Sequence, residues 1–310
     1  MTGSSSNIKS RILITGGSGL VGRHLTSVLL AEGYSVAHLS RSQGQFGRVR
    51  VYRWDPDQGI LDPMALDGVD YIIHLAGANI GEKRWSEKQR KKIVSSRVDS
   101  ALLLHRIVSE NNVMLKAFIS ASAVGYYGSE TTETIYTEQD QPASDFLAST
   151  CRQWEGAADV FEKSGTRTVK IRSAVVLDKN DSALRRLMMP AKFGFLVRLG
   201  SGRQYMPWIH IKDLCGIYLK AIEDPNLSGA VNAVSPQHVS HYEFIKALSS
   251  EMKKPVFPVN VPSFFLYSML GDMSSVVLKG SRISSDKITE AGYKFTFDNL
   301  YDALDDILKE

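Results

Sequence analysis

The sequence predicts an α/β fold, a doubly wound parallel sheet joined to a smaller, mostly helical C-terminal lobe. Short apolar runs alternate with stretches at helical spacing through the first 177 residues. A glycine-rich turn joins the first run to the first helical stretch, and after residue 178 the alternation gives way to helical and irregular segments. Because parallel neighbours need long crossovers, this alternation indicates a sheet covered by helices on both faces.

The expected elements follow from these runs in order. Strands are predicted at residues 11–15, 34–39, 49–54, 71–75, 117–120 and 168–177, and helices at 20–30, 88–110 and 149–163. Further helices are predicted at 183–193, 211–222, 241–252 and 263–278. We therefore expect residues 11–177 to form the sheet domain and residues 178–310 to form a second lobe over the carboxyl edge of the sheet, with later segments crossing back.

Composition and charge narrow the class of protein. With 43% hydrophobic and 23% charged residues in 310, the chain is typical of soluble globular proteins, and no apolar run is long enough to cross a bilayer. Residues 1–10 lack the apolar middle of a secretory signal, so we expect a flexible leader and a cytoplasmic protein. Cys151 and Cys215 form no CxxC pattern, which argues against a disulfide framework or a cysteine metal site.

The net charge of +4 is small for this length, although residues 83–97 are strongly basic. That run lacks the interleaved aromatic residues of a nucleic-acid-binding segment, so a solvated helix face is the better interpretation. We expect neither a nucleic-acid partner nor a membrane partner, and a homodimer is left open.

The turn after the first expected strand has the pattern of a dinucleotide site. Gly16, Gly19 and Gly22 stand in T-G-G-S-G-L-V-G, directly after a strand and directly before a helix. Such a turn lets backbone N–H groups approach a pyrophosphate, and the helix offers the positive end of its dipole. This position makes the sheet domain Rossmann-type. The residues expected to contact the cofactor here are Gly16, Gly17, Ser18, Gly19, Leu20, Val21 and Gly22.

The end of the second expected strand indicates which coenzyme is bound. An acidic residue there accepts hydrogen bonds from the ribose of NAD, but this chain has Ser40 and Arg41 and no acid. An arginine pairs with a 2′-phosphate, so NADP(H) is predicted. The fourth strand ends in H-L-A-G-A-N, where the small residue Gly77 lets the backbone lie close to a bound ribose, and His74 is expected to be a buried structural group.

These motifs resemble those of extended short-chain dehydrogenases/reductases, the group that contains nucleotide-sugar epimerases. The strings S-A-V-G-Y-Y-G, C-R-Q-W-E, G-S-G-R-Q-Y, W-I-H-I and V-P-S-F-F-L-Y-S-M-L-G-D-M sharpen the likeness to the YfcH-type "epimerase family" proteins, from residue 11 to about residue 308. The resemblance implies NADP(H) binding and a family-specific C-terminal domain. It also implies cofactor contacts from Ser40, Arg41, Leu75, Ala76, Arg97 and Val176.

The catalytic residues of the family are only partly present. Ser122 matches the serine that orients a substrate carbonyl, but the places of the Tyr-x-x-x-Lys pair are held by Leu147 and Cys151. Without a nearby cation, presenting a phenolate at pH 7 costs about 4 kcal/mol. The usual proton relay is therefore weakened.

Other residues could replace the missing pair. Tyr126 or Tyr127 could donate a proton as a neutral phenol, and His210 could project into the cleft from the second lobe. Each also has a structural interpretation, as an amphipathic rim residue or as a hydrogen-bonded histidine. Arg203, beside flexible glycines, could bind an anionic substrate group or be a surface residue.

Two functions remain open from the sequence. The first is an NADP(H)-dependent oxidoreductase or epimerase-like enzyme for an unknown small substrate, with nucleotide-sugars among the candidates. The second is a non-catalytic NADP(H)-binding sensor or partner-binding protein, with a link to cell division, a label that some such proteins carry. Ser122, Tyr127 and His210 are the catalytic candidates, and Tyr126 and Arg203 are the substrate candidates.

Overall fold

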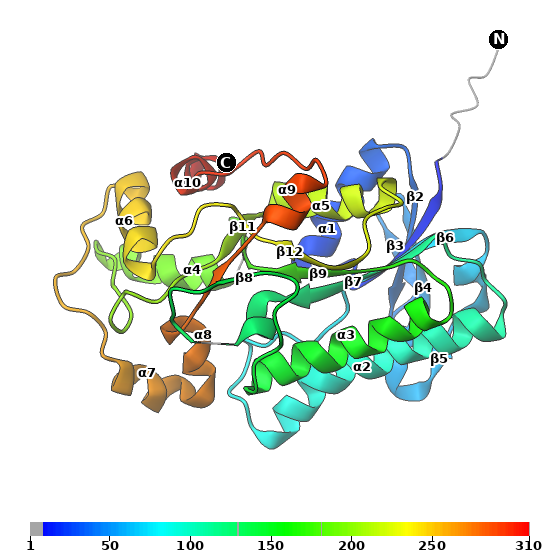
Figure 1. Cartoon of the computed structure of the whole chain (residues 1–310), viewed down its shortest axis with the longest axis horizontal. Helices are drawn as coiled ribbons and strands as arrows, with labels where there is room; N and C mark the ends of the chain where they lie inside the picture. Colours follow the sequence, from blue (N-terminus) through cyan, green and yellow to red (C-terminus); the bar gives the residue numbers. More distant parts are fainter. Residues whose placement is uncertain (1–8, 129, 181, 310) are drawn as a thin grey trace, which may run out of the picture.

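A mostly parallel sheet runs through the middle of the molecule. The computed structural model describes residues 9–128, 130–180 and 182–309. The strands of the sheet lie in the order β12-β9-β7-β6-β1-β2-β4-β3, with β5 paired to β4, and helices cover both faces (Figure 1). Only β3 and β5 pair antiparallel to a neighbour. The predicted Rossmann-type doubly wound fold is therefore confirmed.

The sheet comprises strands spread over much of the chain. They are β1 (Arg11–Thr15), β2 (Ser35–Ser40), β3 (Gly44–Phe46), β4 (Val49–Asp55), β5 (Ile60–Leu61), β6 (Val69–His74), β7 (Ala117–Ala123), β9 (Thr168–Ser173) and β12 (Gly229–Ala233). The helices α1 (Leu20–Ala31) and α5 (Ile211–Glu223) lie on one face, and α2 (Glu87–Glu110) and α3 (Phe146–Lys163) lie side by side on the other (Figure 1). Short 3₁₀ turns are η1 (Pro56–Gln58) and η2 (Pro63–Leu66).

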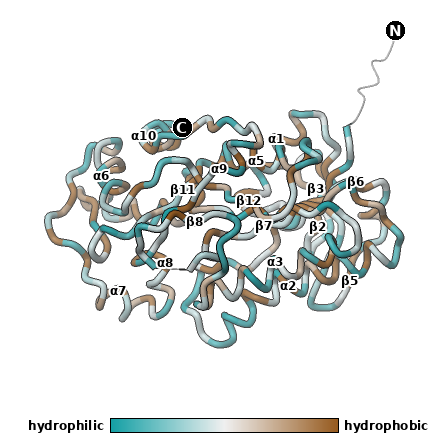
Figure 2. The backbone as a smooth tube through the Cα atoms, viewed as in Figure 1, coloured by the Kyte–Doolittle hydropathy of each residue, from teal (hydrophilic) through white to brown (hydrophobic). Residues whose placement is uncertain are grey.

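The apolar runs become strands because both faces of the sheet are covered. In β1, Ile12 and Ile14 pack in the layer under α1 and α5, whereas Leu13 packs in the layer under α2 and α3. All three side chains are fully buried. A strand buried on both faces needs a continuous apolar run rather than alternation, and Figure 2 shows this hydrophobic colouring through the centre.

The order in which successive strands join the sheet reverses beside β1. This reversal determines where the candidate site lies. β1 pairs with β2 on one side and with β6 on the other, so the crossovers leave β1 in opposite directions. At such a switch point the two sets of connections diverge and open a crevice at the carboxyl ends of the strands. The glycine-rich turn after β1 and the residues after β6 and β7 meet at this edge.

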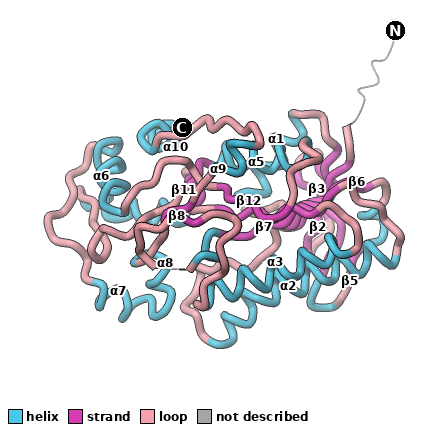
Figure 3. The backbone as a smooth tube through the Cα atoms, viewed as in Figure 1, coloured by secondary structure: helices cyan, strands magenta, loops and turns pink. Residues whose placement is uncertain are grey.

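The second part of the chain consists mostly of helices and loops (Figure 3). The elements outside the main sheet and its four covering helices include β8 (Ile135–Tyr136), β10 (Val175–Leu177), α4 (Ser182–Met188), η4 (Met189–Phe193), β11 (Trp208–His210), α6 (His241–Met252), α7 (Ser263–Leu270), η5 (Gly271–Ser274), α8 (Ser275–Leu278), β13 (Arg282–Ile283), α9 (Asp286–Glu290) and α10 (Leu300–Lys309). Within the described ranges, no helix combines the length and the apolar character needed to cross a bilayer.

The structure divides some of the expected elements. The strand predicted at 168–177 divides into β9 and β10, and β10 leaves the main sheet to pair with β11. The helix predicted at 263–278 is interrupted at Gly271, whose φ of +60° no continuous helix can accommodate. The segment 211–233 returns to the sheet as α5 and β12. The division at residue 177 stays a proposal, with this return included.

Candidate functional site

The glycine-rich turn after β1 leaves no room for side chains. Gly16 has a φ of +68°, and a Cβ there would lie 2.9 Å from the carbonyl of Leu75. A Cβ on Gly22 would lie 2.5 Å from the Gly16 carbonyl oxygen and 2.6 Å from the Cα of Gly17. Helix α1 begins at an N-cap glycine, Gly19, that makes no side-chain capping bond. The turn and the helix end therefore form a close backbone cradle that suits an anionic group.

The residues after β6 are held against this turn by Thr15. Its Oγ1 accepts the backbone N–H groups of Leu75 and Ala76, each at 3.1 Å, and lies 2.9 Å from Nδ1 of His74. His74 is fully buried, and its Nε2 lies 3.1 Å from Oγ of Ser100. Burial lowers the pKa of His74 to about 4, so the ring is neutral and structural at pH 7.

The end of β2 presents an exposed arginine. Arg41 is 69% exposed, and its guanidinium is 3.7 Å from the exposed carboxylate of Asp57, a weak surface pair. The parallel register of β2 and β4 places Arg53 beside Ser40. Sequence reasoning missed Arg53, because only the pairing of β4 with β2 brings it to this edge. Two arginines thus flank the place where a 2′-phosphate is expected.

Arg97 reaches the same edge from the middle of α2. Its guanidinium carbon would be 2.9 Å from a Cβ on Gly77 and lies 4.9 Å from the centre of a ring of Trp154. Its Nη1 donates to the carbonyl of Ile93 at 2.9 Å. Burial lowers the pKa of Arg97, and no carboxylate among the described residues pairs with it. A cation is therefore held against the backbone after β6.

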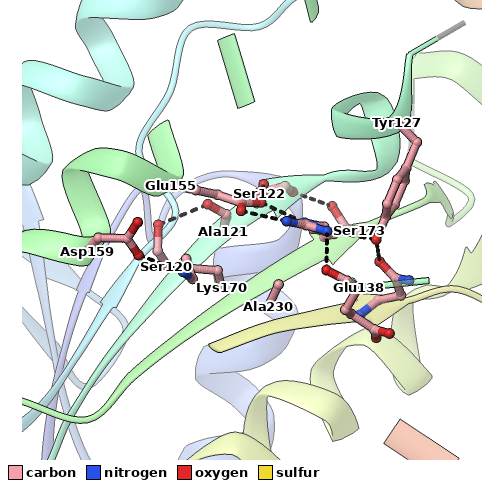
Figure 4. Close-up of polar contacts among 12 residues, drawn as sticks. Ser120, Ala121, Ser122, Tyr127, Glu138, Glu155, Asp159, Lys170, Ser173 and Ala230 are labelled. Atoms are coloured by element: carbon pink, nitrogen blue, oxygen red, sulfur yellow. Dashed lines mark hydrogen bonds and ion pairs between the residues drawn. The ribbon is translucent and has the colours of Figure 1, made fainter. Parts of the chain in front are cut away.

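Ser122 points into the protein rather than towards open space. It is 2% exposed, and its hydroxyl donates to Oε1 of Glu155 at 2.6 Å (Figure 4). Glu155 also receives two hydrogen bonds from Arg172, each at 2.8 Å, in a buried two-point ion pair. Its side chain is thus turned inward and bonded to a carboxylate within the core, and the role of Ser122 in orienting a substrate stays a prediction from the sequence.

Tyr127 belongs to the same buried network. It is 2% exposed, its hydroxyl donates to Oδ1 of Asn232 at 2.7 Å, and it accepts a hydrogen bond from Arg172 at 2.8 Å. Burial raises the pKa of Tyr127, so the phenol stays neutral. Both the donor and the acceptor capacity of its hydroxyl are thus occupied within the core, and Tyr127 as the proton donor stays a prediction from the sequence.

Tyr126 is the member of the tandem that keeps contact with solvent. It is partly buried, on the 3₁₀ turn η3 (Val124–Tyr127) that follows β7. The guanidinium carbon of Arg172 lies 3.5 Å from the centre of its ring. A cation against a phenol ring holds the ring in position and leaves the hydroxyl free of that contact.

His210 has a structural position in the second lobe. It is 1% exposed, its Nδ1 accepts the backbone N–H of Lys212 as the N-cap of α5, and its Nε2 lies 3.2 Å from a carboxylate oxygen of Asp306. Phe297 stacks against the ring at 3.9 Å between centroids. Both ring nitrogens thus face groups at the ends of helices or on them, and the catalytic role of His210 stays a prediction from the sequence.

The places of the missing pair lie under η3. A Cβ on Gly125 would be 3.5 Å from Cβ of Leu147 and 3.9 Å from Sγ of Cys151. Burial raises the pKa of Cys151 to about 12, so the thiol is neutral. Val176 lies partly buried on β10, opposite Ile209 of β11. Arg203 is exposed on a turn of the second lobe, and no described contact brings it to the cluster.

Comparison with known proteins identifies the family that this sequence matches. Residues 12–234 match the family model described as "NAD dependent epimerase/dehydratase family", and residues 261–307 match "Domain of unknown function (DUF1731)". Epimerase family protein YfhF of Bacillus subtilis is 33% identical over 96% of this chain and 98% of its own length. Epimerase family protein Mb2239 of Mycobacterium bovis is 35% identical over 94% of this chain and 96% of its own length.

Solved structures of similar fold include a protein of the same epimerase family. The crystal structure of human epimerase family protein SDR39U1 (isoform 2) with NADPH has a TM-score of 0.85 and 30% identity, covering 96% of this chain and 99% of that one. UDP-N-acetylglucosamine 4-epimerase from Bacillus cereus has a TM-score of 0.78 at 19% identity, over 96% and 98% of the two chains, a likeness of fold alone.

Proposed function

The chain belongs to the NAD dependent epimerase/dehydratase family, and from this premise we propose that it is an NADP(H)-dependent oxidoreductase or epimerase-like enzyme. Membership confirms the resemblance to extended short-chain dehydrogenases/reductases and their epimerase family branch. The single observation that carries the proposal is the backbone cradle at the switch point, where a Cβ on Gly22 would come within 2.6 Å of two backbone atoms.

The residues of this chain fit a dinucleotide. The close glycines and the uncapped start of α1 would receive the pyrophosphate, and Leu75 and Ala76 lie beside them, held by Thr15. The human relative SDR39U1 was crystallised with NADPH, which supports the same coenzyme here. When bound, NADP(H) supplies or accepts a hydride at its nicotinamide ring.

The edge beside β2 supports the phosphorylated coenzyme. Arg41 is mostly exposed and its ion pair with Asp57 is long, so an incoming phosphate can replace that partner at little cost. Arg53 would add a second positive charge next to Ser40. No acidic residue stands at the end of β2 to repel the extra phosphate. The arrangement therefore favours NADP(H) over NAD(H).

The polar groups near β7 favour reduction of a carbonyl as the chemistry. Ser122 and Tyr127 are sequestered, so Tyr126 is the phenol that we assign as the proton donor. A neutral phenol can donate to the oxygen of a carbonyl as hydride reaches its carbon. The substrate class stays open, with nucleotide-sugars among the candidates, and a cytoplasmic location and a homodimer remain predictions of the sequence.

A substrate screen tests the proposed activity. Purified protein with NADPH would be offered a panel of aldehydes, ketones and nucleotide-sugars, and oxidation would be followed through the absorbance of the reduced nicotinamide. We expect turnover with at least one carbonyl class, and slower turnover for Tyr126→Phe. Tight NADPH retention without turnover of any substrate would contradict the enzyme and favour the non-catalytic sensor.

A further inference from the structure

A cation that pairs with no carboxylate of the described residues lies between α2 and the backbone that follows β6. The guanidinium of Arg97 lies over Trp154 and beside Gly77, and its one side-chain hydrogen bond within the described residues goes to a carbonyl of its own helix. A partly buried charge that lacks a counterion is costly. Charged groups in such surroundings cluster at functional sites, which makes Arg97 a candidate to act on a bound ligand.

The neighbours of Arg97 indicate which half of a bound dinucleotide it would face. Gly77 follows β6, and Arg97 lies over Trp154 of α3, the helix that carries Cys151 under the turn that follows β7. Arg41 and Ser40 stand on the other side of the switch point, after β2. A dinucleotide that crosses the switch point places its adenosine on the β2 side and its nicotinamide on the side of β6 and β7. Arg97 therefore belongs to the nicotinamide half.

We propose that Arg97 supplies the positive charge beside the nicotinamide half of the coenzyme. The family's lysine would supply that charge, but its position is held here by Cys151. We further propose that the charge of Arg97 biases the bound coenzyme towards the reduced form. The inference rests on the proposed NADP(H) binding. The oxidised nicotinamide ring is positively charged and the reduced ring is neutral. A fixed positive charge nearby raises the free energy of bound NADP⁺ relative to NADPH, whereas the phosphates are common to both forms and cancel in the comparison.

A purely structural role for Arg97 would have different consequences for coenzyme binding. If the guanidinium only anchors α2 to Trp154 of α3, its removal would change folding stability and would weaken both coenzyme forms equally. The ratio of the two dissociation constants separates these roles, because only a charge near the ring changes the ratio.

The test measures Kd for NADPH and for NADP⁺ by calorimetry, with the wild type and Arg97→Met. We expect the wild type to prefer NADPH, and the preference to fall about tenfold in Arg97→Met. Arg106→Met is the matched control, since Arg106 is an exposed arginine of the same helix that pairs with Glu110, and it should leave the ratio unchanged. An unchanged ratio in a folded Arg97→Met protein overturns the inference.

Further variants separate the charge of Arg97 from its packing. Arg97→Lys retains the charge and should keep the preference for NADPH, while Arg97→Gln retains polarity and should lose it, which covers the case in which methionine prevents folding. Adding Cys151→Lys to Arg97→Ala should restore part of the lost preference, and a double variant no different from Arg97→Ala contradicts the replacement. If the wild type binds neither coenzyme, the proposed function itself fails, whereas binding with an insensitive ratio removes Arg97 alone.

Discussion

Two parts of the carboxyl edge of the sheet differ in construction, and we call the part after β1 and β2 the open edge and the part at the end of β7 the closed edge. After β1, the chain presents backbone N–H groups, glycines and an exposed arginine at the end of β2. After β7, the polar side chains satisfy one another: Ser122 and Arg172 bond to Glu155, and Tyr127 bonds to Arg172 and Asn232. The open edge therefore leaves groups available to bind a ligand, whereas the polar side chains of the closed edge are hydrogen-bonded to one another.

The difference teaches why binding is easier to infer than catalysis in this protein. A glycine cradle has no side chains with which to fill itself, so its geometry implies an external ligand. Serine, tyrosine and arginine can each serve a substrate or stabilise a fold, and their partners decide between these roles. The following changes would break or sharpen the comparison.

The largest expected effect is on the closed edge. Arg172→Met would leave the Glu155 carboxylate buried without its partner, and we expect the free energy of unfolding in urea to fall by about 3–5 kcal/mol. Arg152→Met, at an exposed position of α3, is the control and should change stability by less than about 0.5 kcal/mol. A loss as small as the control would mean that the network does not hold this edge together.

Lowering the pH should reduce the free energy of unfolding through His74, the buried histidine behind the glycine-rich turn. The pKa of His74 is lowered to about 4, so the unfolded chain binds a proton below about pH 6.5 that the folded chain refuses until about pH 4. Stability therefore falls as pH drops through this window. His74→Gln should remove roughly 2–3 kcal/mol of the loss between pH 7 and pH 4.5, measured by denaturant unfolding at both values. A variant with the wild-type pH dependence would contradict a buried neutral His74.

A methyl group in the cradle should reduce coenzyme affinity. Gly22→Ala adds a Cβ that would lie within 2.6 Å of Gly16 and Gly17, and we expect Kd for NADPH to rise about ten- to hundredfold. Gly156→Ala is the matched control, because a Cβ there meets nothing within 4 Å on α3. Fluorescence titration measures both, and equal affinities would remove the cradle from the account.

The tandem tyrosines should respond differently to the loss of one oxygen. Tyr127→Phe removes the donor to Oδ1 of Asn232 and one of the acceptors of Arg172, and we expect a loss of about 1–2 kcal/mol in unfolding free energy. Tyr126→Phe should change stability by less than about 0.5 kcal/mol and should slow carbonyl reduction. Thermal and urea unfolding of the two variants measure the contrast, and the reverse order would exchange their roles.

Much of the fold could be predicted from the sequence, because its signals are local. The glycine turn before α1 and the buried run of β1 follow from short-range pattern. The split of 168–177 could not, because β10 leaves the sheet only when β11, about 30 residues later, offers it a partner.

The site divides in the same way. The cradle residues Gly16 and Gly22 occupy the switch point as the pattern indicates. The inward position of Ser122 was missed because its partner Glu155 lies 33 residues away on α3, and motif position carries no information about which way a strand residue faces at its end. The surroundings of His210 could not be predicted for a similar reason, since Asp306, which faces its ring, lies in the last helix.

The most direct test of the central claim is a calorimetric titration of the wild type and Arg41→Ala with NADPH and NADH. The account predicts that the wild type binds NADPH more tightly than NADH by about tenfold or more, and that Arg41→Ala loses most of this preference while still binding both. Equal affinity of the wild type for the two coenzymes, or no uptake of either, would contradict it.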